Sequence, residues 1–205
     1  MSQITIHNFP RGARGLRVAW QCEEMGLDYR CESVTYPPSP QYLALNPLGS
    51  VPFLQDQGGV AINESVAMML YLAQAYGPTP LLPTAEAALR ARVLQMTIFG
   101  EASLGAALNP LLAAHFAAPA DDKRNWSVRG QEDRMARNLD YVAHILAGAP
   151  FLAGDDLTLA DISVSTALGM WRGALGKSLP GSLATYQDRI AARPAYQRAQ
   201  AKSQE

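Results

Sequence analysis

Apolar and polar residues alternate over short stretches near the start of the chain and then recur with a helical period. Residues 3–7 and 29–34 alternate as strands do, and residues 16–25 between them have helical spacing that ends at Gly26. A strand, a helix and a second strand within this length predict a parallel β-α-β unit with a right-handed crossover.

A hairpin and a further helix are predicted to follow this unit. Residues 52–55 and 60–62 have the composition of two short strands, and the turn-forming residues 56–59 join them. Residues 41–45 form a short helical run before the hairpin, and residues 64–76 follow it with an amphipathic helical pattern. The order β-α-β-α-β-β-α predicts a small α/β domain.

A cluster of helix-breaking residues, Gly77-Pro78-Thr79-Pro80 and then Pro83, indicates a domain boundary. Strand signals disappear beyond it. We therefore expect an α/β domain at residues 1–78 and an all-helical domain at residues 86–205. Its helices are predicted over residues 86–118, with a kink at Pro110, and over residues 121–147, 158–172, 183–192 and 194–201.

The start of the helix at residues 158–172 carries a capping signal. Thr158 can cap the first turn, while Asp161, three residues later, can accept a hydrogen bond from the capping N–H. Such caps stabilise a helix by about 1 kcal/mol. We expect Asp161 to have a structural role rather than a catalytic one.

Composition restricts the possible partners. The 205 residues include 17 Lys+Arg against 18 Asp+Glu, so the overall charge indicates neither a nucleic acid nor an anionic membrane as a partner. No signal sequence is evident, and no apolar run reaches the roughly 18 residues that a membrane span needs. We expect a soluble, cytoplasmic protein.

The metal-binding and redox-active residue types are few. The three histidines lack metal-ligand spacing, so no metal site is expected. Cys22 and Cys31 are too few for a disulfide framework and lack C-x-x-C spacing. We expect both to be buried as small apolar side chains.

One turn stands out as a candidate binding site, in the stretch Asn46-Pro47-Leu48-Gly49-Ser50-Val51-Pro52-Phe53-Leu54. Val51 precedes a proline and is therefore driven into extended geometry, in which its main chain can pair with a peptide laid beside it. Further on, Glu64-Ser65 falls in the first turn of a predicted helix, where unpaired N–H groups attract a carboxylate. Together they predict a site for a small peptide-like anion.

These two stretches resemble the glutathione-binding half of the cytosolic glutathione transferase family, and the resemblance extends over essentially the whole chain. It implies a thioredoxin-like N-terminal domain plus an all-α C-terminal domain, with a cis peptide bond before Pro52. It further implies a detoxifying transferase that takes glutathione as a substrate, conjugates it to a hydrophobic small molecule and forms a homodimer.

The resemblance also implies roles for individual residues. The main chain of Val51, before Pro52, would pair with the cysteinyl unit of glutathione, and Ser50 would approach the glycyl end. Ser65 would take the γ-glutamyl carboxylate and Glu64 the γ-glutamyl ammonium. The alternative for Glu64-Ser65 is that an acid and a hydroxyl merely favour a helix start.

Catalysis requires the glutathione thiolate. A thiol pKa of about 8.5 must fall by about two units, which corresponds to about 2.7 kcal/mol, before the thiolate dominates. The family places a Tyr, Ser or Cys beside the sulfur, but in this chain the matching positions hold Asn8, Gly12 and Arg14. The remaining candidates are Arg14, the amide of Asn8 and the N–H groups of residues 13–15.

Each of these candidates has a simpler interpretation. Arg14 could be a solvent-facing charge, and Asn8 could cap the turn with its side chain. Arg11 and Arg17 are expected to be surface charges. The sequence alone leaves these alternatives open.

A second, hydrophobic substrate would lie against the long helix that begins near residue 86. Phe9, Phe99, Asn109 and Trp171 are the favoured walls, and three further candidates are Leu104, Phe116 and Trp126. The function that we expect is conjugation, with glutathione-dependent reduction of disulfides or peroxides as the next alternative and glutathione binding without catalysis as the third.

Overall fold

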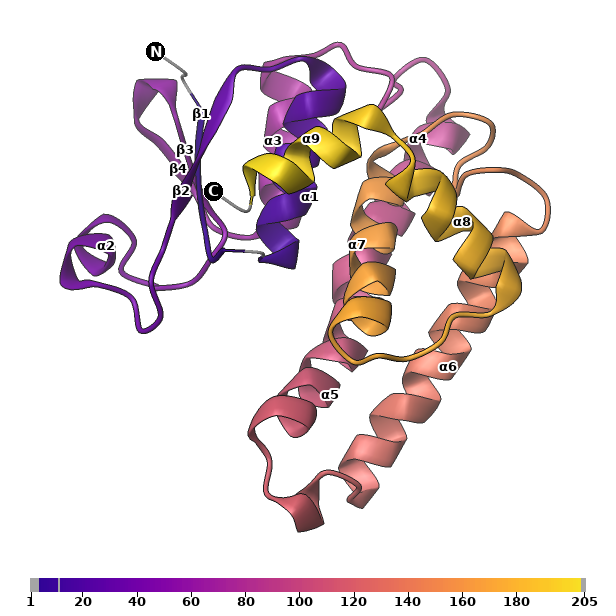
Figure 1. Ribbon diagram of the computed structural model, residues 1–205. Coiled ribbons are helices and arrows are strands. Elements are labelled where there is room, and N and C mark those ends of the chain that lie inside the picture. The colour runs from indigo at the N-terminus through magenta and orange to yellow at the C-terminus, as the bar shows by residue number, and fades with distance from the viewer. Residues whose placement is uncertain (1–3, 11, 204–205) are drawn as a thin grey trace. The chain divides into compact units, whose positions relative to one another are not determined.

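The computed structural model describes residues 4–10 and 12–203 and divides the chain into two compact units (Figure 1). The first contains the described residues of Met1–Thr79 and Ala191–Glu205, and the second is Pro80–Ile190. The boundary near residue 79 lies within the predicted breaker cluster. Arg11 and the first residue of the predicted strand at 3–7 lie outside the described part of the chain.

A four-stranded mixed sheet forms the centre of the first unit. Its strands lie in the order β2-β1-β3-β4, with β1 parallel to β2 and antiparallel to β3, which pairs in turn with β4. Helices α1 and α3 cover one face of the sheet, and α2 lies on the other side (Figure 1). The bounds are β1 Ile4–Asn8, α1 Ala13–Met25, β2 Tyr29–Ser33, α2 Pro40–Leu45, β3 Phe53–Asp56, β4 Val60–Ile62 and α3 Ser65–Ala75.

Apolar side chains on the covered face of the sheet make the core of this unit. Ile6 of β1 and Leu54 of β3 lie opposite one another in register, and both are fully buried. Trp20 of α1 and Met68 of α3 are also fully buried. Helix α1 ends at Gly26 in the left-handed conformation, with φ 65°, which glycine adopts without a steric penalty. The order of these helices and strands along the chain confirms the predicted β-α-β-α-β-β-α order.

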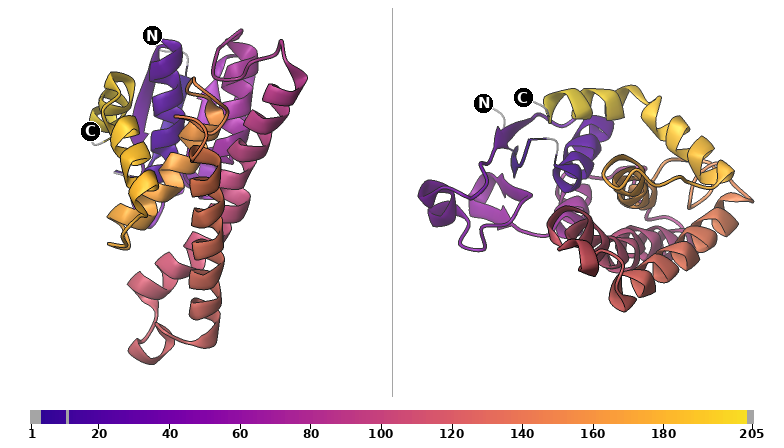
Figure 2. Two further views of the ribbon diagram at one scale, coloured as in Figure 1. Left: turned by 90° about the vertical axis from the view of Figure 1, so that its right-hand side faces the viewer. Right: turned by 60° about the horizontal axis from the view of Figure 1, so that its bottom comes forward.

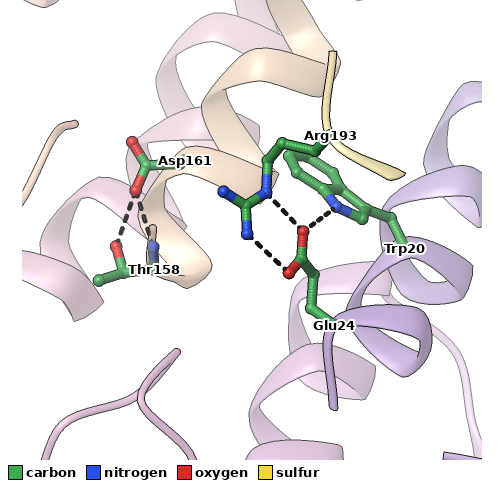
Figure 3. Close-up of polar contacts among 5 residues, drawn as sticks. All are labelled: Trp20, Glu24, Thr158, Asp161 and Arg193. Carbon is green, nitrogen blue, oxygen red and sulfur yellow. Dashed lines mark hydrogen bonds and ion pairs between the residues drawn. The ribbon is translucent and has the colours of Figure 1, made fainter. Parts of the chain in front are cut away.

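The last helix, α9 (Pro194–Lys202), packs on α1 and belongs to the first unit. Tyr196 meets Trp20 edge to face, with ring centroids 5.1 Å apart. Arg193 donates to both carboxylate oxygens of Glu24 over 2.7 and 2.8 Å, and the indole of Trp20 donates to the same carboxylate (Figure 3). These contacts place the C-terminal residues in the first unit, which differs from the predicted helical domain at 86–205.

The second unit is entirely helical apart from one isolated β-bridge between Phe151 and Gly154. Helix α7 runs through its interior, with α4, α5 and α6 along one side (Figure 2), and residues 159–168 are all buried. The helices are α4 Ala87–Phe99, α5 Ala106–Ala117, α6 Trp126–Leu146, α7 Leu159–Gly173 and α8 Gly181–Ala191.

The predicted long helix at residues 86–118 is interrupted earlier than its proline. A π-helical segment, Gly100–Gly105, joins α4 to α5, while Pro110 lies inside α5. Ser163 of α7 packs directly on Gly100, where an added Cβ would come within 2.3 Å of its hydroxyl, and that hydroxyl donates to the carbonyl of Thr97 over 2.6 Å. The close approach of α7 therefore coincides with the irregular segment.

Asp161 anchors the start of α7. Its carboxylate accepts from the N–H and hydroxyl of Thr158 at 2.9 and 3.0 Å (Figure 3), from the N–H of Leu152 at 2.9 Å, and from the hydroxyl of Tyr186 at 2.9 Å. Burial raises the pKa of Asp161 above its ordinary value, and these hydrogen bonds act in the opposite direction. Asp161 accordingly has the structural surroundings predicted for it.

Candidate functional site

The loop before β3 presents an open stretch of main chain. The Val51–Pro52 peptide bond is cis, as the family resemblance implies. The side chain of Val51 is half-buried and packs on a small cluster of Val34, Tyr42 and Phe53. Within the described residues, neither main-chain group of Val51 takes part in a main-chain hydrogen bond. This segment is therefore available to pair with an added peptide.

Two asparagines tie this loop to the start of α3. Asn46 is buried; it donates to the carbonyl of Ser50 over 2.9 Å and to Oδ1 of Asn63 over 3.1 Å. Asn63 donates back to Oδ1 of Asn46 over 3.2 Å, and the hydroxyls of Ser50 and Tyr42 complete the network. Because the network fixes both segments at once, Val51 and the residues after Asn63 keep a constant relationship.

The sequence pattern alone assigns no role to Asn46 or Asn63. Asn46 opens the stretch that ends in Pro52-Phe53-Leu54, and Asn63 directly precedes Glu64-Ser65, so both lie within the motifs. The signal that could have found them is their chemistry, because a buried side-chain amide needs partners for both its donor and its acceptor.

Glu64 has an unusual backbone at the entrance to α3. With φ 69° and ψ 105°, it is the one residue other than glycine that has positive φ in the described chain. Such a conformation costs roughly 1–3 kcal/mol and persists where the surroundings hold it. Glu64 is exposed, whereas Ser65, which follows it, is 3% exposed and begins the helix.

Arg17 lies beneath this helix start. It is 1% exposed, and its Nη1 donates to the hydroxyl oxygen of Ser65 over 3.2 Å. The expectation that Arg17 is a surface charge is therefore wrong. The physical reason is its place on the face of α1 that packs against α3, where the guanidinium meets the Ser65 hydroxyl rather than solvent.

Asn8 closes the turn between β1 and α1. It is buried, and its Nδ2 donates to the carbonyl of Gly12 over 2.8 Å. Its side chain occupies space that a Cβ at Gly12 or Gly15 would enter, at 2.5 and 2.2 Å respectively. The contacts of Asn8 are those of the turn-capping interpretation, and the two glycines make room for it.

Arg14 lies in the first turn of α1 and is half-buried. The residue that precedes this helix is Gly12, which has no side chain to cap it. Arg14 and the first N–H groups of α1, which attract an anion, therefore belong to the same turn.

The predicted walls of a second-substrate site fall in different units. Phe9 is in the first unit, edge to face with Tyr36 at 5.8 Å, whereas Phe99, Asn109 and Trp171 are in the helical unit. Within that unit Asn109 is exposed and Trp171 is buried. Of the weaker candidates, Leu104 is completely buried, and Phe116 and Trp126 are 68% and 81% exposed.

The two cysteines differ in their surroundings. Cys22 is buried, and this burial raises the pKa of its thiol well above the ordinary range, so it is a poor nucleophile. Cys31 is half-buried, so it is less enclosed than the expected burial of both cysteines implies. In residues 4–10 and 12–203 no group of His, Cys, Asp and Glu could hold a metal ion, and no helix is long and apolar enough to cross a membrane.

Comparison with known proteins agrees with this architecture. The family model for the N-terminal domain of glutathione S-transferase matches residues 14–75, and the model for its C-terminal domain matches residues 87–198. Glutathione S-transferase 3 of Zea mays is 30% identical in an alignment that covers 97% of this chain and 93% of the maize protein.

Two solved structures extend the comparison. The theta class glutathione S-transferase of Xanthomonas axonopodis pv. citri, with glutathione bound, has a TM-score of 0.82 and 27% identity, covering 97% of each chain. A glutathione transferase of Methylococcus capsulatus has a TM-score of 0.84 and 29% identity, covering 98% of each chain. The sheet with α1 to α3 corresponds to the N-terminal domain of a glutathione transferase fold, and the helices from α4 onward correspond to its C-terminal domain. The chain belongs to the glutathione S-transferase family.

Proposed function

We propose that this protein binds glutathione along Val51 and the start of α3 and transfers its thiolate to an electrophile that carries an apolar group. The observation that carries the proposal is the fixed relationship between the open main chain at Val51 and the Arg17–Ser65 pair, which the Asn46–Asn63 amides maintain.

The cysteinyl unit of glutathione would pair with the main chain of Val51, as a strand adds to a sheet edge. This pairing would orient the thiol without using a side chain. The glutathione-bound relative from Xanthomonas supports glutathione as the occupant. In this proposal Pro52 serves only to shape the turn.

The γ-glutamyl carboxylate would lie at the N-terminus of α3. The Ser65 oxygen accepts a hydrogen bond from Arg17, so the hydroxyl proton of Ser65 remains available to be donated to that carboxylate. The buried positive charge and the first-turn N–H groups of α3 favour the same anion. Exposed Glu64 would hold the γ-glutamyl ammonium.

Ser50 has a supporting role in this arrangement. Its hydroxyl donates to Asn63 and its carbonyl accepts from Tyr42 and Asn46, so it holds the loop in place. We place it near the glycyl end of glutathione on the strength of the family resemblance alone.

The thiolate would be stabilised at the start of α1. A helix N-terminus supplies at most about 2 kcal/mol to a nearby anion. Ionising the thiol near neutrality requires about 2.7 kcal/mol, so a second contribution is needed. Arg14 lies in that same turn, and its positive charge would supply this contribution.

Two assays with purified protein test this proposal. Calorimetric titration with glutathione measures binding, and a chromogenic aryl halide beside a mixed glutathione disulfide measures which reaction follows. Conjugation of the aryl halide with saturation in both substrates supports a transferase. Turnover of the disulfide alone would indicate a reductase, and tight binding without either turnover would indicate a binding protein.

We also propose that the protein is a homodimer. Several large apolar side chains around α2 are exposed, namely Tyr36, Leu43, Leu45 and Leu48, at 85%, 41%, 41% and 65%. An apolar patch of this kind is typical of an interaction surface. Sedimentation at a mass of 22.1 kDa would contradict the dimer.

A further inference from the structure

The segment that contains α2 and the loop up to Val51 carries no charged side chain (Figure 1). Between Glu32 and Asp56 the sequence has no Lys, Arg, His, Asp or Glu, although 17% of the chain as a whole is charged. We call the stretch between these two acids the uncharged segment. Its neutrality matters because glutathione has two carboxylates, one at each end.

The glycyl end of glutathione would meet the uncharged segment in the binding mode proposed above. A tripeptide held at its first residue by Ser65 and at its second by Val51 continues past Val51, on the side away from Ser65. The loop there packs on α2, since the Tyr42 hydroxyl donates to the carbonyl of Ser50 over 2.6 Å. A Cβ added at Gly49 would come within 2.9 Å of the Leu43 side chain. The third residue would therefore lie against α2 and this loop.

The neutral hydroxyls beside Val51 are already engaged within the protein. The Tyr42 hydroxyl bonds the carbonyl of Ser50, and the Ser50 hydroxyl donates to Oδ1 of Asn63 over 3.2 Å. Gln41 is an exposed amide on α2. An amide at such a position competes with water for a carboxylate and brings no opposite charge to it.

His7 is the titratable side chain that contacts the uncharged segment from the sheet. Its ring centroid lies 5.8 Å from that of Tyr42 and 5.7 Å from that of Phe53. One ring nitrogen, Nε2, is 2.8 Å from Oε1 of Gln55. The imidazole is thus held among rings and a neutral amide on the face of the sheet.

Other positive side chains in the described part of the first unit belong to different elements. Arg30 pairs with Glu32 of its own strand at 3.1 Å. Arg14 and Arg17 belong to α1, where the proposed function assigns them to the thiolate and to the γ-glutamyl carboxylate. The carboxylates of Glu23 and Glu24 on α1 pair with the cations near the C-terminus, namely Arg193, Arg198 and Lys202.

We propose that the thiol substrate is recognised through its γ-glutamylcysteinyl part, so that the site accepts glutathione whose glycyl carboxyl group is an amide or an ester as readily as glutathione itself. A cation beside the glycyl end would favour the free carboxylate, and an anion would exclude it. The uncharged segment supplies neither, so it does not select between the two. This inference rests on the proposed glutathione site and names the class of thiol that the site takes.

The test compares three ligands by calorimetry on the full chain at pH 7 under reducing conditions. They are glutathione, its glycyl ethyl ester, and the analogue with an amide in place of the γ-glutamyl α-carboxylate. The ester should bind within about threefold of glutathione. The γ-glutamyl amide should bind at least about tenfold more weakly, because it loses hydrogen bonds that its negative charge strengthens.

A variant that introduces a charge locates the glycyl end. Gln41→Lys places a cation on α2, so the preference for glutathione over its ester should rise by about threefold or more, and added salt should reduce this gain. Gln57→Lys is the matched control, because Gln57 is exposed in the turn between β3 and β4. It should leave the preference unchanged.

The failure of this inference can be told apart from the failure of the glutathione site. If glutathione bound and its ester bound more than about threefold more weakly, a cation from elsewhere would hold the glycyl carboxylate, and this inference alone would be wrong. An unchanged preference in Gln41→Lys would contradict the place of the glycyl end against α2. No binding of glutathione at all would overturn the site and this inference together.

Discussion

The guanidinium of Arg17 donates a hydrogen bond to the hydroxyl oxygen of Ser65 over 3.2 Å, and both side chains are buried. This hydrogen bond holds a positive charge and the Ser65 hydroxyl together at the N-terminus of α3, where the first N–H groups of the helix also favour an anion. We infer that Arg17 orients the Ser65 hydroxyl and supplies positive charge for the γ-glutamyl carboxylate.

Replacing Arg17 should weaken glutathione binding. Loss of a charged hydrogen bond costs about 1.5–3 kcal/mol, so Arg17→Gln should raise the Kd for glutathione by roughly 10–100-fold. Arg17→Lys, which retains the charge, should recover part of the affinity. The measurement is calorimetry on variants whose far-UV circular dichroism matches the native protein.

A ligand control separates this role from a general loss of structure. A glutathione analogue with an amide in place of the γ-glutamyl α-carboxylate should bind the native protein and Arg17→Gln about equally. If the variant weakened both ligands to the same extent, Arg17 would not act on that carboxylate.

Arg14 should set the pH dependence of conjugation. If it stabilises the thiolate, Arg14→Gln should raise the pKa of the bound thiol toward its ordinary value of about 8.5. Below that pKa the rate should fall about tenfold per pH unit, so the loss of kcat/KM should be large at pH 6.5 and small at pH 9. A loss that is independent of pH would remove Arg14 from thiolate stabilisation, and Arg137→Gln provides an exposed control.

Asp161 should be essential for stability and not for binding. Asp161→Ala leaves the buried N–H groups of Leu152 and Thr158 without their acceptor, so we expect a loss of about 2–4 kcal/mol in the free energy of unfolding. Asp188→Asn, which breaks an exposed pair with Arg172, should cost less than about 1 kcal/mol. Urea unfolding measures the free energy of unfolding of both variants. If Asp161→Ala and Asp188→Asn lowered it equally, Asp161 would not anchor the start of α7.

Glu23 should make the protein sensitive to acid. Burial acts to raise its pKa, but hydrogen bonds from Lys202, Arg198 and Tyr29 lower it below the ordinary value. A lowered pKa in the folded state means that the stabilisation is present above the ordinary glutamate range, near pH 4.3, and is lost as the pH falls through the folded-state pKa.

The matching variant is Glu23→Gln. It should be less stable than the native protein at pH 7, and its stability should fall less steeply between pH 5 and pH 3. Thermal unfolding across this range measures the difference, and parallel curves for the two proteins would contradict the role of Glu23.

Much of the architecture could be predicted because it follows from local patterns. Alternation over residues 29–34, the breaker cluster at residues 77–80 and the capping signal at Asp161 each determine their own segment. The docking of α9 on α1 could not be predicted in this way, because it depends on a contact between Trp20 and Tyr196, residues distant in the sequence.

The candidate site shows the same division. Motif residues such as Val51, Glu64 and Ser65 could be selected from the sequence, and their surroundings could not. Arg17 resembles any other helix arginine until α3 is packed against it, and the pairing of Asn46 with Asn63 exists only once the loop is folded. Side-chain partners across elements are the information that the sequence pattern lacks.

The most direct test of the proposed glutathione site is a crystal structure of this protein with glutathione bound. We predict that the cysteinyl main chain pairs with Val51, that the γ-glutamyl carboxylate lies within hydrogen-bond distance of Ser65, and that the sulfur faces the first turn of α1. Glutathione bound elsewhere, or a groove at Val51 that stays empty at saturating glutathione, would contradict the proposal.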